Sequence, residues 1–263
     1  QLDLFFEDMI APLQGGEKDT DKMLGYHIEL LYGMSNIYFR KKNADKSMFY
    51  LKQMDAQLQR LNGKYIPFWY SRYTNLLALN LNFSNDWKGA VVLLEKGLED
   101  SSLKEQERAL LSLTLCMIQF QQNNLKEVKR IINALTKTDN WYLKQMGNEW
   151  LFNYKAIEVL LHFDLGNDQL AESKVLSFQR KYARHFKKDK SNPLWPFLLL
   201  VKSVLFTPEE ILTKTFYNKV EKSIPWRGAT EDLFNMCFYG WLKAKMTKKS
   251  TYEVTLALVN FIH

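Results

Sequence analysis

The chain is poor in the residues that break or cross-link a fold. Its 263 residues include only 6 prolines and 11 glycines against 46% hydrophobic residues, which argues against intrinsic disorder and favours an ordered core. The two cysteines, Cys116 and Cys237, each stand in an apolar stretch, where a thiol acts as a small hydrophobic group. We therefore expect no disulfide framework and a reducing compartment.

Long hydrophobic runs are also missing. No stretch approaches the roughly 18 consecutive apolar residues that a membrane-spanning helix needs. The best run, residues 196–201, is followed at once by Lys202. We expect no membrane insertion, and we take the cytoplasm as the expected location.

Motifs of catalysis and metal binding are almost absent. The only glycine pair, Gly15-Gly16, lacks the Gly-Lys-Ser/Thr of a phosphate loop, and no nucleophile elbow or kinase signature appears. No His-x-x-x-His or Cys-x-x-Cys spacing suggests zinc. The histidines are scattered: His27, His162, His185 and His263. We expect no metal, no cofactor and no enzymatic activity.

The first residues resemble the end of a helix. Gln1 opens directly onto Leu-Asp-Leu-Phe-Phe-Glu-Asp-Met-Ile, and a loop follows over residues 11–20. A lone helix here would have no partner nearby in the sequence, so we expect residues 1–20 to be a helix remnant and loop of a longer protein. A mature exported protein that begins at Gln1 is the alternative.

A short turn phrase recurs along the chain, with Asn or Asp opening a new amphipathic segment. It begins at Asn43, Asp86, Asn124 and Asn167, at intervals of 43, 38 and 43 residues. Each copy lies between two helical patterns, which is typical of stacked helical hairpins. The sequence therefore predicts an all-α fold.

Helical periodicity predicts paired helices throughout and no strand. The expected helices span 21–41, 45–61, 67–83, 86–99, 103–122, 125–137, 141–164, 168–187, 195–205, 208–223, 231–247 and 251–263. Four Ser, Thr or Asn residues stand three positions before a glutamate and predict capping boxes. These pairs are Ser102 and Glu105, Asn124 and Glu127, Thr207 and Glu210, and Ser250 and Glu253.

Small residues stand twelve positions apart where paired helices would cross. The pairs are Ser35 and Ser47, Ala78 and Ala90, and Cys116 with the larger Val128. With Gly97 at a later small position, residues 28–178 resemble a degenerate tetratricopeptide array. The resemblance implies a right-handed superhelical array of antiparallel helical hairpins, an α-solenoid over residues 21–190. We expect residues 191–263, which are rich in aromatics, to form a C-terminal helical cap.

The same resemblance implies a non-enzymatic scaffold whose first helices line a concave groove for a peptide or helix of a partner protein. The positions that it assigns to this groove are Tyr32, Asn36, Asn75, Leu113, Met117 and Gln121. Basic residues expected of a carboxylate clamp are missing there, so a neutral or amphipathic peptide fits better. The alternative is that these side chains only fill the inner face of the array.

Positive charge is concentrated in the last third of the chain. Residues 172–263 carry 16 Lys and Arg against 8 Asp and Glu, whereas the rest of the chain is nearly balanced. One basic patch consists of Arg180, Lys181, Arg184, Lys187 and Lys188, and a second cluster of Lys243, Lys245, Lys248 and Lys249. Such patches bind phosphate or acidic partners, which makes a nucleic-acid-associated or regulatory module the alternative function. They also occur as solvated helix ends.

Overall fold

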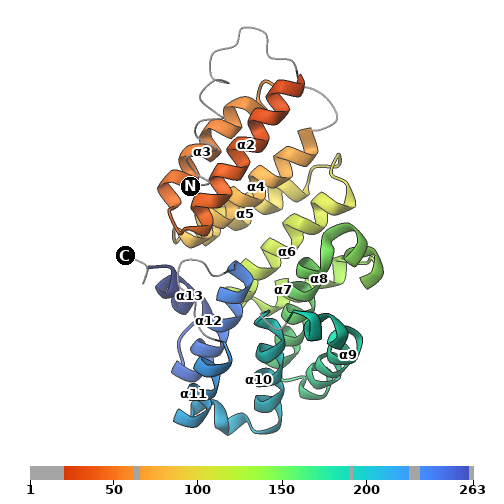
Figure 1. Cartoon of the computed structure of the whole chain (residues 1–263), viewed down its shortest axis with the longest axis vertical. Helices are drawn as coiled ribbons and strands as arrows, with labels where there is room; N and C mark the ends of the chain where they lie inside the picture. Colours follow the sequence, from red (N-terminus) through yellow and green to blue (C-terminus); the bar gives the residue numbers. More distant parts are fainter. Residues whose placement is uncertain (1–20, 62–65, 190–191, 225–231, 261–263) are drawn as a thin grey trace. The chain divides into compact units, whose positions relative to one another are not determined.

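The computed structural model describes residues 21–61, 66–189, 192–224 and 232–260, and this part of the chain is all-α (Figure 1). It contains twelve α-helices and one 3-10 helix, and no strand occurs among the residues described. Residues 1–20, predicted to be a helix remnant and loop, lie outside them. No described helix is long and apolar enough to cross a membrane.

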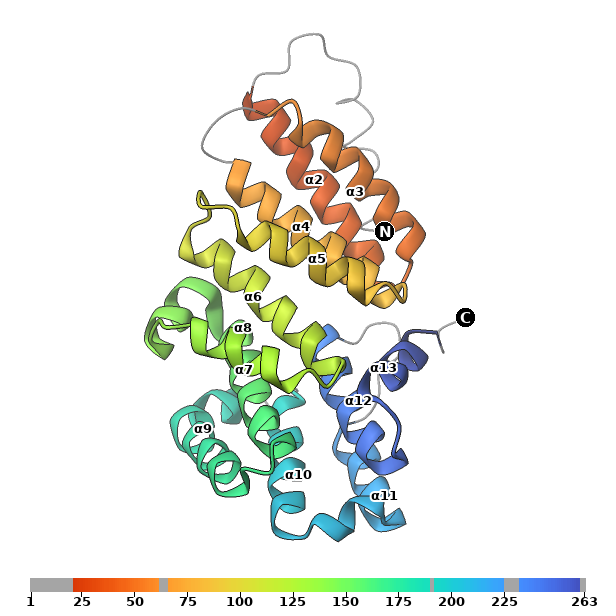
Figure 2. The same cartoon turned by 180° about the vertical axis from the view of Figure 1, so that it is seen from behind.

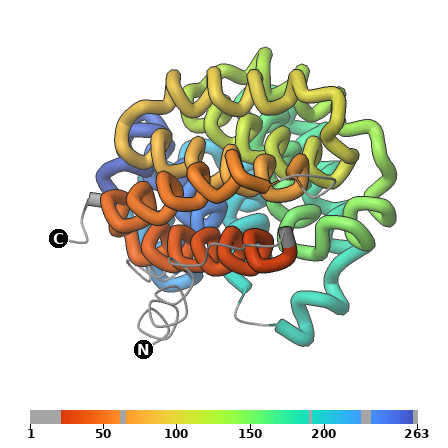
Figure 3. The backbone as a smooth tube through the Cα atoms, turned by 90° about the horizontal axis from the view of Figure 1, so that it is seen from above, coloured from red at the N-terminus to blue at the C-terminus, as the bar shows by residue number. Residues whose placement is uncertain are grey.

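The chain divides into two compact units, residues 1–115 and 116–263, with the boundary inside helix α6. Unit 1 contains α2 (Asp21–Arg40), α3 (Ala44–Leu58), α4 (Ile66–Phe83), α5 (Trp87–Leu98) and the start of α6 (Glu105–Gln121). Seen from above, α2 and α3 run side by side as a hairpin (Figure 3). The pair α4 and α5 forms the second hairpin of this unit.

Unit 2 begins with the end of α6, and the elements described in it are all helices (Figure 2). These are α7 (Leu125–Ala134), α8 (Asp139–Asp164), α9 (Asp168–Lys188), α10 (Leu194–Phe206), the 3-10 helix η2 (Pro208–Leu212), α11 (Lys214–Ser223), α12 (Leu233–Thr247) and α13 (Thr251–Asn260). Packed pairs include α8 with α9 and α12 with α13.

Two features of unit 2 differ from the sequence prediction. The single helix expected over 208–223 is wrong, because Thr213 separates η2 from α11. Its hydroxyl donates to the carbonyl of Glu210 at 2.7 Å and accepts from the N–H of Phe216 at 3.1 Å, so one side chain serves both helix ends. Helix α8 is kinked at Gly147, whose φ of 86° and ψ of 173° only glycine adopts without strain.

Five turns between paired helices share one backbone geometry. Each contains a residue in the left-handed region: Lys42, Asn85, Asn123, Gly166 and Lys248, with φ between 56° and 70°. The following residue donates its N–H to the carbonyl five positions back, as Asn43 does to Tyr38 at 2.9 Å, which closes a Schellman turn. In the first four turns this donor is also the N-cap of the next helix, which confirms the predicted turns.

Side-chain caps complete some of these helix starts. The side chains of Asn43 and Asp86 accept the N–H three residues on, at 3.0 Å and 2.9 Å. The capping box of Ser250 and Glu253 is confirmed by its two reciprocal bonds, at 3.1 Å and 3.4 Å.

The other three predicted capping boxes are wrong, because Asn124 and Thr207 form no side-chain cap and Ser102 is not at a helix start. The amide of Asn124 donates to Gln119 at 3.0 Å, and the hydroxyl of Thr207 donates back to the carbonyl of Ser203 at 3.0 Å. Ser102 lies before the first residue of α6.

Paired helices approach most closely at small side chains. Ser47 donates its hydroxyl to the carbonyl of Ser35 at 2.9 Å, and the hydroxyl of Ser35 lies 3.0 Å from both the carbonyl and the hydroxyl of Ser47. Asn80 of α4 adds a third helix to this contact by donating to the Ser47 hydroxyl at 3.0 Å. Ala78 and Ala90 are both fully buried. The predicted small positions therefore lie in the interior.

Glycine extends this small-residue packing to other helix pairs. A Cβ at Gly97 of α5 would lie 3.1 Å from a methyl of Thr74 and 3.2 Å from a methyl of Leu111, which is tighter than ordinary contact. In unit 2, a Cβ at Gly240 of α12 would lie 2.8 Å from the hydroxyl of Thr255 in α13. The last hairpin, inside the predicted cap, is thus built like the earlier ones.

Replacing Ala90 by Leu should destabilise unit 1 by about 1 to 3 kcal/mol, because Ala90 is fully buried and the larger side chain should overpack the site. The matched control is Val92→Leu on the same helix, where the native side chain is 66% exposed and the change should be nearly neutral. Chemical unfolding of both variants measures the difference. Equal stability of the two variants would show that Ala90 does not lie at a tight crossing.

Candidate functional site

Half of the predicted groove is closed to a ligand. Leu113, Met117 and Gln121 are only 3%, 0% and 1% exposed, so their assignment to an open groove is wrong for the free protein. Residues 111–121 of α6 are all buried. Burial raises the pKa of the Cys237 thiol to about 12, and the side chain of Gln121 partly offsets this effect.

The other predicted groove residues are partly exposed on two neighbouring helices of unit 1. Tyr32 of α2 contacts Trp69 of α4, with ring centroids 6.2 Å apart. Further along both helices Phe39 contacts Phe83, with ring centroids 5.9 Å apart. Because both contacts advance in the same direction, α2 and α4 run parallel, as the first helices of consecutive hairpins do.

Arg72 brings a cation to this surface. Its guanidinium lies 3.4 Å from the centre of the Phe68 ring, and its Nη1 donates to the Phe68 carbonyl at 3.2 Å. Burial lowers the pKa of Arg72, while Tyr32 and Glu107 raise it, and arginine stays charged at neutral pH. Burial also raises the pKa of Tyr32, which keeps its hydroxyl neutral as both donor and acceptor.

Several polar groups here keep unused hydrogen-bonding capacity. Asn36 lies one turn beyond Tyr32 on α2, and its amide forms no hydrogen bond with any residue that the structure describes. Asn75 accepts from Thr114 at 2.6 Å through its oxygen, which leaves its N–H donors free. We call Tyr32, Asn36, Trp69, Arg72 and Asn75 the α2–α4 face.

Sequence reasoning found three members of this face and missed Trp69 and Arg72. The sequence does contain a pattern that could have identified them. Arg72 stands four positions after Phe68 and three after Trp69, and residues at these spacings share one side of a helix. On this helix, the resemblance to a tetratricopeptide array assigns roles only to Asn75 and Ala78.

The residues of the predicted basic patch lie on α9 in unit 2 and are exposed. Arg180, Arg184, Lys187 and Lys188 are all exposed and form no ion pair with the residues described. Their spacing of four, three and one residues places them along one side of the helix. Lys181 differs from them, because its ammonium pairs with Asp139 at 2.9 Å.

The second basic cluster is partly structural. Lys243 pairs with Glu221 at 2.7 Å and lies 4.0 Å from the centre of the Tyr217 ring. Lys245 pairs at 2.7 Å with Asp164, a nearly buried carboxylate. These charges join helices of unit 2, and we assign them no ligand.

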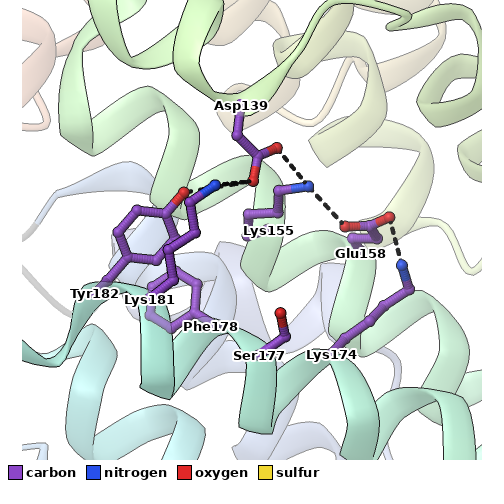
Figure 4. Close-up of a pocket in the computed structure, with 8 residues that line it drawn as sticks. All are labelled: Asp139, Lys155, Glu158, Lys174, Ser177, Phe178, Lys181 and Tyr182. Atoms are coloured by element: carbon purple, nitrogen blue, oxygen red, sulfur yellow. Dashed lines mark hydrogen bonds and ion pairs between the residues drawn. The ribbon is translucent and has the colours of Figure 1, made fainter.

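An ion-pair network joins α8 and α9 (Figure 4). Lys155 and Lys181 each lie 2.9 Å from one oxygen of Asp139. Lys155 also lies 3.3 Å from Glu158, which pairs with Lys174 at 2.7 Å. The groups surround a small cavity of about 120 Å³ and satisfy one another. We call them the Asp139 network.

Hydrogen bonds within the Asp139 network favour the charged forms of Asp139 and Lys155. Burial alone would raise the pKa of Asp139, but hydrogen bonds from Lys155 and Lys181 outweigh it and hold that pKa below its ordinary value. Burial likewise works to lower the pKa of Lys155, and its bonds to Asp139 and Glu158 raise it overall. Asp139 and Lys155 are therefore both charged at neutral pH.

No arrangement of three or more His, Cys, Asp or Glu suited to a metal ion occurs within the described ranges. Comparison of the chain with protein-family models, with curated proteins and with solved structures gave no match. The function must therefore be argued from these surfaces.

Asp139→Asn should cost about 1 to 2 kcal/mol of stability at neutral pH, since it breaks two partly buried ion pairs. The folded-state pKa of Asp139 is depressed, so its contribution is present above the unfolded pKa and is lost as pH falls through the folded value. The cost of the substitution should therefore shrink in acid. Thermal unfolding at neutral pH and below pH 4 tests this.

Asp168→Asn is the matched control for this measurement, because Asp168 stands in the first turn of α9 and is exposed. It should change stability little at either pH. An Asp139→Asn variant that loses as much stability in acid as the native protein would contradict the assignment.

Proposed function

We propose that this protein is a non-enzymatic interaction module that binds an extended peptide of a partner protein on the α2–α4 face. The observation that carries the proposal is the set of unused N–H donors on Asn36, Arg72 and Asn75, flanked by the rings of Tyr32 and Trp69.

The chemistry of this face suits a peptide backbone. An extended chain presents carbonyl oxygens at regular spacing, and each can accept from an amide or guanidinium donor. Hydrogen bonds from a charged donor contribute about 1.5 to 3 kcal/mol. The two aromatic rings add apolar contact for one or two side chains of the peptide.

The proposal includes the predicted tetratricopeptide-like array, with residues 191–263 as its cap. Its support is local: hairpins closed by one turn geometry, small residues at their crossings, and parallel α2 and α4. Arg72 changes the expected ligand. A peptide with an acidic or carbonyl-rich segment opposite Arg72 now fits better than a purely neutral one.

Selection from a random peptide library on the intact chain should enrich sequences that bind the α2–α4 face. Arg72→Gln should then weaken the selected peptides about tenfold or more, because a charged donor is removed. Asn36→Ala should weaken them as well. Fluorescence anisotropy with labelled peptides measures the affinities.

Arg60→Gln provides the matched control, since Arg60 is exposed at the end of α3 and should not affect binding. Circular dichroism of each variant separates lost binding from lost folding. Selected peptides that bind the Arg72→Gln and Asn36→Ala variants as tightly as the native protein would overturn the proposed site.

A second candidate function is nucleic-acid binding through α9. It is favoured by the four exposed, unpaired cations Arg180, Arg184, Lys187 and Lys188. Nine helical residues rise about 12 Å, enough for these side chains to reach several phosphates of one strand.

If this second function is correct, affinity for duplex DNA or RNA should fall steeply with salt. Replacing the four cations by Gln should reduce the slope of log K against log salt by about 3 to 4. Removing an equal charge at four exposed lysines elsewhere, Lys52, Lys96, Lys104 and Lys126, is the control. Equal loss in both variants would show only nonspecific attraction.

A further inference from the structure

The cavity of the Asp139 network lies between α8 and α9, and neither proposed surface includes it (Figure 4). Its volume of about 120 Å³ is well below the roughly 300 to 1,000 Å³ of sites for drug-sized ligands. It is also several times the roughly 10 to 15 Å³ that one water molecule needs. The cavity is therefore sized for a small ion or a single functional group.

Three lysines from both helices line this cavity: Lys155 of α8, and Lys174 and Lys181 of α9. An ammonium group carries three N–H donors. Lys174 donates only to Glu158, at 2.7 Å. Lys155 donates to Glu158 at 3.3 Å and to Asp139 at 2.9 Å. Each of these two lysines therefore keeps an N–H donor that no described residue accepts.

Lys181 and Ser177 add further donors on α9. Lys181 donates to Asp139 at 2.9 Å and to the hydroxyl of Tyr182, which leaves one N–H donor. Ser177 stands three positions after Lys174 and four before Lys181, so all three share one side of the helix. Its hydroxyl is exposed, forms no hydrogen bond with any described residue, and points toward α8 in Figure 4.

The cavity carries a net positive charge. Its three ammonium groups face two carboxylates, Asp139 and Glu158, and no other Lys, Arg, Asp or Glu among the described residues lines it. The carboxylates repel an anion, but two lysines already pair with each of them. These pairs also hold the ammonium groups around one space. An anion there can accept charge-assisted hydrogen bonds from several of them at once.

We propose that this cavity binds a tetrahedral oxyanion, a phosphate or sulfate group. Its oxygens accept from the remaining N–H donors of the three lysines and from the hydroxyl of Ser177. Four oxygens in a tetrahedral arrangement can face donors of both helices, whereas a planar carboxylate offers only two oxygens. The carboxylates of Asp139 and Glu158 stay paired and keep the lysines in position. The bound group thus adds a further link between α8 and α9.

Titration of the intact chain with inorganic phosphate and with sulfate at neutral pH tests this proposal. Calorimetry and NMR chemical shifts should show saturable binding at millimolar or lower concentration, and the melting temperature should rise with the concentration of the anion. Potassium chloride and potassium acetate at the same ionic strength should give no saturable change.

O-Phospho-L-serine distinguishes two sources of the phosphate group. Tighter binding of this ester than of inorganic phosphate would identify the phosphoryl group of a larger molecule as the ligand. Equal or weaker binding of the ester would identify the free anion. Both results support a site for a tetrahedral oxyanion.

Lys174→Gln should weaken phosphate binding at least tenfold, because it removes a charged donor. Ser177→Ala should weaken it severalfold without breaking an ion pair, and it keeps the test informative if the first variant does not fold. Arg180→Gln is the matched control, since it removes one positive charge from the same helix at an exposed position that does not line the cavity. It should leave phosphate affinity unchanged.

Three results would contradict the proposal. They are no saturable binding of phosphate or sulfate, unchanged affinity in both the Lys174→Gln and Ser177→Ala variants, and an equal loss of affinity in Arg180→Gln and Lys174→Gln. Because the cavity and the α2–α4 face lie in different units, failure of one proposal leaves the other open.

Discussion

The close approach of paired helices at small side chains is the constraint on which the rest of the structure depends. At Ser35 and Ser47 the helices are near enough for each hydroxyl to reach the other helix's carbonyl, and Asn80 ties a third helix to the same point. These contacts fix the angle between the two helices of the hairpin and therefore which helix sides stay exposed. The partly exposed side of α2 beside α4 is the surface left over once these crossings are satisfied.

Much of the fold was readable from the sequence, because helix boundaries depend on local chemistry. The turn phrase, the small residues twelve apart and the helical periodicity all act within one hairpin, and the helices occur close to their predicted ends. The wrong predictions concern features that depend on packing between residues far apart in the sequence. Leu113 and Met117 follow the same pattern as exposed groove positions, and only the tertiary structure shows that their helix is enclosed. The kink at Gly147 depends on a single backbone conformation.

The candidate sites show the same division. Tyr32, Asn36 and the α9 cations could be found from spacing along a single helix, whereas Arg72 gains its importance from a ring and a carboxylate on other turns and helices.

The turn geometry has a consequence for how the length of such a chain can vary. In four hairpins the residue that closes the first helix is also the N-cap of the second, so there is no spare residue at the turn. An inserted residue there would rotate the second helix by about 100° and turn its apolar stripe away from its partner. Insertions and deletions should therefore be tolerated between hairpins rather than within them. The unequal intervals of 43, 38 and 43 residues fit this division, with rigid pairs joined by connections of adjustable length.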